Sequence, residues 1–285
     1  MKPAPKCALS LAVLLGMSVQ PATAETLILL GGGVAGDDEG GIAWSALADL
    51  AFTEQTSVSL SLASTRAEGV PEDIRTRSWD LALDHNFGPV GLELSAGQWG
   101  DPEHFDSDDG SLALYHRGDN WYFAASYLVR DIDLTFRALL PQIAIERKLQ
   151  TTATGLGLRA RYTSENGVSV TVRGRQYDYD ADVTRLDQLE LLRRRAPTAI
   201  TLAGALLDSS LSAGIEWPVG ERLLNVMVAR DATATDETDI NSLSVGMLSP
   251  VGRNFDLDVS LGYSRAANGD SAVFLSALLF YYTSL

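Results

Sequence analysis

The sequence has few of the residues on which thiol and metal chemistry depend. Cys7 is the only cysteine among 285 residues, and there are three histidines. Because Cys7 lies in a segment that we expect to be removed, the mature chain is predicted to contain no cysteine. Disulfide bonds and thiol catalysis are therefore excluded.

Long hydrophobic runs and basic charge are also scarce. Several apolar runs of roughly 20 residues would be needed for a polytopic helical membrane protein, and none is found. The net charge is −15, whereas nucleic-acid binding needs a surplus of Lys and Arg. The hydrophobic content of 46% can bury a core, which argues against an acidic disordered chain.

The first 24 residues have the pattern of a Sec signal peptide. Lys2 and Lys6 form a basic start, an apolar stretch follows over 7–19, and Ala22-Thr23-Ala24 precedes Glu25. Cys7 begins the apolar stretch and so is not a lipoprotein acylation site. We expect residues 1–24 to be removed, which leaves residues 25–285 with a net charge of −17 and a single lysine against 19 arginines.

Strict alternation of polar and apolar residues dominates the rest of the chain. Residues 57–62 and 255–263 alternate without a break, as expected of a strand with one polar and one apolar face. Fourteen segments are predicted as strands: 26–35, 41–53, 56–65, 76–87, 90–99, 110–117, 120–130, 151–164, 167–178, 200–217, 221–231, 239–248, 254–264 and 271–283.

The connections between these segments alternate between tight turns and longer, more acidic loops. This asymmetry is typical of an all-β, up-and-down antiparallel transmembrane barrel, here of about 14 strands with 12–16 possible. Aromatic residues cluster beside the tight turns, as in an interfacial girdle: Phe87, Trp121, Tyr162, Trp217 and Phe255. A β-sandwich or β-helix also alternates, but a sandwich of this size would bury some strands on both faces.

These features together resemble those of Gram-negative outer-membrane β-barrel (porin-like) proteins over the whole mature length. The segment 272–285 also resembles the C-terminal strand that such barrels use as an assembly signal, although Leu285 stands where Phe or Trp is usual. The resemblance implies an outer-membrane location with both termini in the periplasm. It also implies contact with lipid, with lipopolysaccharide and, during insertion, with the barrel-assembly machinery.

If the apolar faces meet lipid, parity points the charged residues of the same strands into the lumen. The candidate pore-lining residues are Arg159, Arg161, Arg173, Arg175, Asp80, Asp84, Glu93, Glu216, Asp256 and Asp258. The basic residues gather on 151–178, and the acidic ones mainly on 76–99 and 254–264. Two interpretations stay open: salt bridges across a filled lumen, or a transverse field acting on passing solutes.

The two longest outer loops are predicted at 131–150 and 179–199, with helix-like stretches at 137–149 and 184–195. They either cap the barrel rim or fold inward and narrow the lumen. The loop 101–110 contains His104, the only plausible general base, and three aspartates, Asp106, Asp108 and Asp109. The spacing does not fit an EF-hand, because Gly110 falls one position early and Arg117 replaces the bidentate Glu.

The sequence therefore predicts a passive channel for small hydrophilic solutes, with no catalytic residues, metal or cofactor. A non-conducting barrel with a structural or surface-interaction role, its lumen filled by a long loop, is the first alternative. A barrel lipid hydrolase acting through His104 is the less favoured one.

Overall fold

The structure is a computed structural model, and it describes residues 26–38, 40–67, 74–101, 105–140, 143–180, 207–234, 239–267, 269 and 271–284. These residues form fourteen strands. They are β1 (Leu27–Asp37), β2 (Ile42–Thr53), β3 (Thr56–Ala67), β4 (Ile74–Asn86), β5 (Val90–Asp101), β6 (Phe105–Arg117), β7 (Trp121–Leu140), β8 (Ile143–Thr163), β9 (Ser169–Tyr179), β10 (Leu207–Val219), β11 (Arg222–Thr233), β12 (Asp239–Pro250), β13 (Phe255–Ala266) and β14 (Ser271–Ser284).

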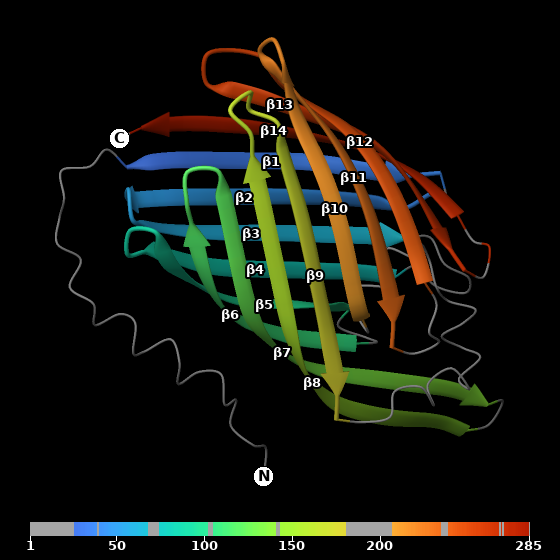
Figure 1. The fold of residues 1–285 in the computed structure, drawn as a ribbon. Helices are drawn as coiled ribbons and strands as arrows, with labels where there is room; N and C mark the ends of the chain where they lie inside the picture. Colours follow the sequence, from blue (N-terminus) through green and yellow to red (C-terminus); the bar gives the residue numbers. More distant parts are fainter. Residues whose placement is uncertain are drawn as a thin grey trace.

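The strands close into one antiparallel barrel in which each strand pairs with its sequence neighbours (Figure 1). Closure is made by β1 and β14, which pair from Leu27 with Ser284 to Asp37 with Phe274. Because every strand has two partners, the sheet has no free edge, and all backbone groups of the ladder can be satisfied within the wall. The predicted fold class and strand number are confirmed.

Glycines with positive φ make several of the tight turns that the sequence predicts. Gly88, Gly167 and Gly220 have φ values of 97°, 79° and 63°. L-residues with a Cβ rarely adopt this region, whereas glycine does so at little cost. These turns set the register of β4–β5, β8–β9 and β10–β11.

Alternate residues of each strand point to opposite faces of the wall. Leu156 and Leu158 of β8 are each 69% exposed, while Gly157 and Arg159 lie on the other face. A contact between Arg159 of β8 and Glu93 of β5 passes over β6 and β7, which is possible only on the concave side. The face of Arg159 is therefore the inner face, and the exposed aliphatic residues point outward.

Aromatic side chains gather at the end of the barrel with the tight turns. Trp121 lies 4.6 Å from the ring of Tyr162 and 5.5 Å from that of Phe123. Phe255 lies 5.0 Å from Tyr281. An interfacial girdle of aromatic residues is expected at this end of the barrel, as the sequence predicted.

The structure corrects the predicted length of three strands. β6 begins at Phe105, so the segment 105–109 is strand and not part of an acidic loop. β7 and β8 continue as a paired hairpin from Asp131 to Leu140 and from Ile143 to Gln150, where a loop with a helix-like stretch at 137–149 was expected. This hairpin extends beyond the neighbouring strands (Figure 1). The other helix-like stretch, 184–195, lies outside the described residues.

Within the described ranges, no helix is long and apolar enough to cross a membrane.

Candidate functional site

A row of arginines lines the inner face of β8 and β9. Arg159 of β8 stands directly opposite Arg173 of β9 in the register, and Arg161 and Arg175 follow on the same face. Alternation in both strands places them there, because Leu158, Ala160, Val172 and Gly174 occupy the outward positions between them. The basic wall is thus built from two neighbouring strands.

Arg159 is held by partners on β7 and β5. Its Nη2 donates to the hydroxyl of Tyr122 and, at 3.5 Å, to Oε2 of Glu93. Its guanidinium also lies 4.8 Å from the centre of the Tyr122 ring, a cation–π geometry. These contacts turn Arg159 along the wall toward β5.

Arg161 bends in the other direction along the wall. Its Nη2 donates to Glu216 of β10 at 3.0 Å and to Ser169 Oγ of β9 at 3.2 Å. Both Arg161 and Glu216 are more than one-third exposed, so solvent screens this pair and its contribution to stability is small. The two salt bridges among the candidate residues therefore follow the wall and do not span the lumen.

Arg173 and Arg175 differ from their neighbours. In the described part of the chain, neither has a hydrogen bond or an ion pair. Each faces a small polar residue on β10, with Ser212 opposite Arg173 and Ser210 opposite Arg175. Two cationic groups of the inner wall are thus available to an anion.

The acidic candidates lie on the inner faces of β4, β5, β10 and β13. Asp84 accepts a hydrogen bond of 2.9 Å from the hydroxyl of Tyr115. The Tyr115 ring lies flat over Gly91, where a Cβ would stand only 2.1 Å from its Cζ. Asp80 lies on the same inner face of β4, with Ser78 and Ala82 as its neighbours on that face. Asp256 and Asp258 of β13 point inward opposite Phe280 and Leu278 of β14.

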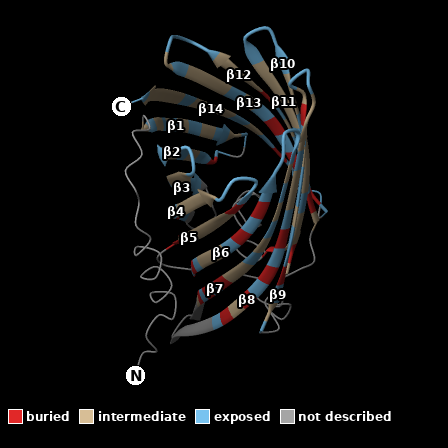
Figure 2. Cartoon of the chain, turned by 60° about the vertical axis from the view of Figure 1, so that its left-hand side comes forward, coloured by how far each residue is buried: buried red, intermediate tan, exposed pale blue. Residues whose placement is uncertain are grey.

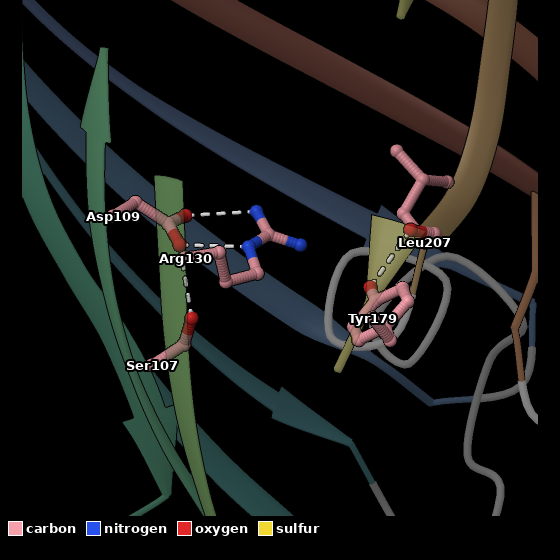
Figure 3. Close-up of polar contacts among 5 residues, drawn as sticks. All are labelled: Ser107, Asp109, Arg130, Tyr179 and Leu207. Carbon is pink, nitrogen blue, oxygen red and sulfur yellow. Dashed lines mark hydrogen bonds and ion pairs between the residues drawn. The ribbon is translucent and has the colours of Figure 1, made fainter. Parts of the chain in front are cut away.

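An ion pair between a buried arginine and a partly exposed aspartate, closer to the long-loop ends of the strands, was not anticipated from the sequence. Arg130 of β7 donates to both carboxylate oxygens of Asp109 of β6, at 2.7 and 2.8 Å (Figure 3). Ser107 Oγ donates to Asp109 at 3.0 Å, and the Arg130 guanidinium lies 4.9 Å from the centre of the Tyr177 ring. The sequence had assigned Asp109 to a loop, so this pairing was not considered.

The inner face near the long-loop ends is buried on many strands, and along β6–β8 buried and exposed positions alternate (Figure 2). We call these residues the buried collar. They include Thr76, Asp101, Phe105, Ser107, Ile132, Thr151, Ala153, Ser264 and Ala272. The arginine row lies toward the other end of the lumen.

The outward face at the same end of β6 and β7 is acidic. Asp106 is opposite Asp133, and Asp108 is opposite Asp131. Carboxylates on this face are incompatible with hydrocarbon, so they lie beyond the apolar band that begins at Leu112. Burial, together with the neighbouring carboxylates of Asp106 and Asp131, raises the pKa of Asp108.

The histidines are not brought together into a site. His85 and His116 lie on the outward face, and His85 Nδ1 is 2.8 Å from Thr56 Oγ1. His104 lies outside the described residues. Among the residues that the structure describes, no group of three or more His, Cys, Asp or Glu side chains could hold a metal ion.

A further feature of the inner face was missed from the sequence. Phe274, Leu278 and Phe280 of β14 occupy inward positions, in the same register rows as Gly262, Asp258 and Asp256 of β13. The strand is apolar on both faces, and parity alone gives an apolar outer face without revealing the apolar inner one. Only the register identifies these three side chains as lumenal.

Similarity to known proteins was found by comparing structures and not by comparing sequences. Neither the family models nor the curated proteins contain a match to the sequence. Among solved structures, the CymD monoaromatic hydrocarbon channel superposes with a TM-score of 0.56 at 12% identity, covering 93% of this chain and 89% of that one. The chain has the fold of outer-membrane channels. Outer-membrane expressed OmpT of Vibrio cholerae gives 0.51 at 8% identity, covering 93% of this chain and 100% of that one.

Proposed function

We propose that the protein spans the outer membrane of a Gram-negative bacterium and acts as a passive channel for small hydrophilic solutes. The outward face supports membrane insertion, since it presents aliphatic residues such as Leu112, Leu114, Leu156 and Leu158 to the surroundings. The aromatic cluster beside the tight turns fits one membrane interface. The acidic residues beyond the apolar band fit the aqueous side.

The inner face carries the proposal of a channel. Arg173 and Arg175 are unpaired among the described residues, and such groups are stable only where water or a solute solvates them. The candidate pore-lining residues would give the lumen a basic wall on β8 and β9 and acidic walls on β4, β5, β10 and β13. Solutes would then move by diffusion through an uneven field, with no chemical step.

Export and orientation belong to the same proposal. Residues 1–24 would direct the chain to the Sec pathway and be removed. The tight turns and both termini would lie in the periplasm, and the acidic loop side would face the exterior. Lipid, lipopolysaccharide and the barrel-assembly machinery would be its partners.

One observation favours a second candidate, a non-conducting barrel. The buried collar shows that inner-face residues near the long-loop ends are shielded from solvent; Ser107 and Ser264 are each 1% exposed. A lumen filled at this level would leave the barrel with a structural or surface-interaction role. His104, on which the hydrolase alternative depends, lies outside the described residues.

Single-channel recording separates the two candidates. Protein expressed as the full chain and purified from membranes is inserted into a planar bilayer in KCl. We expect discrete current steps. Replacing both Arg173 and Arg175 with Gln should shift the permeability ratio toward K⁺ on the order of twofold, because two fixed positive charges leave the wall.

Arg230→Gln serves as the matched control. Arg230 lies on the outward face at the long-loop end of β11, where it pairs with Asp239 at 3.1 Å. Its replacement should leave the permeability ratio unchanged. A folded, heat-modifiable sample that gives no current steps would contradict the channel and support the filled barrel.

A further inference from the structure

The inner wall contains an apolar stripe on β14, β1 and β2. It consists of Phe274, Leu278 and Phe280 of β14, Leu29 of β1 and Leu47 of β2. None of these side chains is buried; each keeps part of its surface exposed on the lumenal side. The positions run from Phe274 near the start of β14 to Leu29 near the start of β1, with Ser276 between Phe274 and Leu278, so the stripe follows the length of the lumen with one polar interruption.

Glycines on the neighbouring strands seat these side chains against the wall. A Cβ at Gly262 would stand 2.0 Å from Cζ of Phe274, and one at Gly33 would stand 2.6 Å from Cγ of Leu278. A Cβ at Gly31 would stand 2.8 Å from Cγ of Leu47. Because the large side chains lie flat over glycine, the stripe presents apolar surface without projecting far into the lumen.

Polar strands border the stripe on both sides. The inner face of β3 carries Ser57, Ser59 and Ser61. The inner face of β13 carries Asp256, Asp258 and Ser260. The stripe is thus separated from the inner faces of the strands on either side of it.

The arginine row lies on the opposite side of the barrel. β1 and β8 are seven strands apart in either direction around the ring of fourteen (Figure 1). The stripe therefore faces the wall that carries Arg173 and Arg175. Asp258 and Asp49, which flank the stripe, would repel an anionic group from that side and direct it toward the arginines.

We propose that the lumen binds and conducts amphipathic anions, small molecules that carry an apolar ring or chain at one end and a sulfonate, carboxylate or similar group at the other. The apolar end would lie on the stripe, where burial of hydrocarbon is favourable. The anionic end would meet Arg173 and Arg175, whose guanidinium groups suit planar or tetrahedral oxyanions. This inference rests on the proposed channel and adds the class of solute to it.

The test measures how small ions block the KCl current through the protein, which is expressed as the full chain, purified from membranes and inserted into a planar bilayer. The probes are benzenesulfonate, ethanesulfonate and phenyltrimethylammonium, whose fixed charges prevent passage as neutral forms. Benzenesulfonate should half-block the current at a concentration about tenfold lower than ethanesulfonate, because only its ring can cover the stripe. Phenyltrimethylammonium, with the same ring and the opposite charge, should block more weakly than benzenesulfonate.

Variants of the stripe and of the arginine row divide the effect between the two walls. Leu278→Asn should remove most of the preference for benzenesulfonate over ethanesulfonate, and Leu47→Asn serves the same purpose if the first variant does not insert. Replacement of Arg173 and Arg175 by Gln should weaken block by both sulfonates. Met227→Gln is the control, since Met227 is an inward apolar residue on β11, away from the stripe.

The outcomes distinguish this inference from the channel itself. Normal KCl conductance with equal block by the two sulfonates would overturn the amphipathic solute class and leave the channel standing. An unchanged preference in Leu278→Asn and Leu47→Asn would do the same, as expected if another segment of the chain covered the stripe. The absence of KCl conductance would overturn the channel.

Discussion

Leu158→Arg should destabilise the membrane-inserted protein by about 2–4 kcal/mol, the cost of an arginine on the lipid face near the middle of a barrel strand. Leu158 lies on the outward face of β8 and is 69% exposed, so no packing within the chain is lost when it is replaced. The cost would come from moving a guanidinium into hydrocarbon. Urea unfolding of the protein in phosphatidylcholine vesicles measures the change.

Ser59→Arg is the matched control on the inner face. Ser59 of β3 stands directly opposite Asp49 of β2, one carboxylate oxygen of which is buried without a hydrogen-bond partner. An arginine here would stay in the lumen and gain a carboxylate neighbour, so we expect little loss of stability. Equal costs at Leu158 and Ser59 would contradict the assignment of the two faces.

Asp109→Asn should lower the free energy of unfolding by about 2 kcal/mol, because it removes the carboxylate charge that faces a buried guanidinium. Arg130 is only 7% exposed and donates hydrogen bonds to both carboxylate oxygens of Asp109. An amide can accept one of the two hydrogen bonds but carries no negative charge to face the guanidinium. The same unfolding measurement in vesicles applies.

Breaking an exposed pair provides the comparison. Arg230 and Asp239 form a salt bridge at the rim, where the Arg230 side chain is 64% exposed and so is solvated by water. Asp239→Asn should therefore cause little measurable change in stability. If the two asparagine variants behave alike, the buried Arg130 guanidinium does not depend on Asp109 for its stability.

Sequence patterns were sufficient to predict the strands of the membrane-spanning part of the barrel. The alternation in 255–263 predicted β13, and the Gly88 and Gly167 turns predicted two of the hairpins. In these regions the outer face contacts lipid and the inner face contacts water, so alternate residues along each strand have the same polarity. The strand number follows from counting such segments.

The strand ends on the long-loop side were underestimated because the pattern inverts there. In β7, Asp131 and Asp133 point outward, while Ile132 and Leu134 point inward and are buried. Beyond hydrocarbon the outer face meets water and the inner face packs, so the polarity of the two faces is exchanged. Strict alternation persisted in 131–134, but its reversed sense, together with the acidic residues, resembled a loop.

The interior could be predicted only in part. Parity gives the face of Arg159 or Glu93, because it needs only the position along a strand. The partners of Arg159 depend on how strands β5 to β8 are staggered, which no pattern in one strand reveals. The apolar stripe was hidden for a related reason, since Phe274 and Leu278 belong to a strand with apolar residues on both faces.

The most direct measurement exploits the absence of cysteine from residues 25–285. Ser212 and Ala213 are neighbours on β10, with Ser212 opposite Arg173 on the inner face and Ala213 on the outer one. Each is replaced in turn by cysteine, and a charged methanethiosulfonate reagent is added while single-channel current is recorded. A water-filled conducting lumen predicts that the reagent reduces the current steps of Ser212→Cys and leaves those of Ala213→Cys unchanged. Modification of both positions alike, or of Ala213→Cys alone, would contradict it.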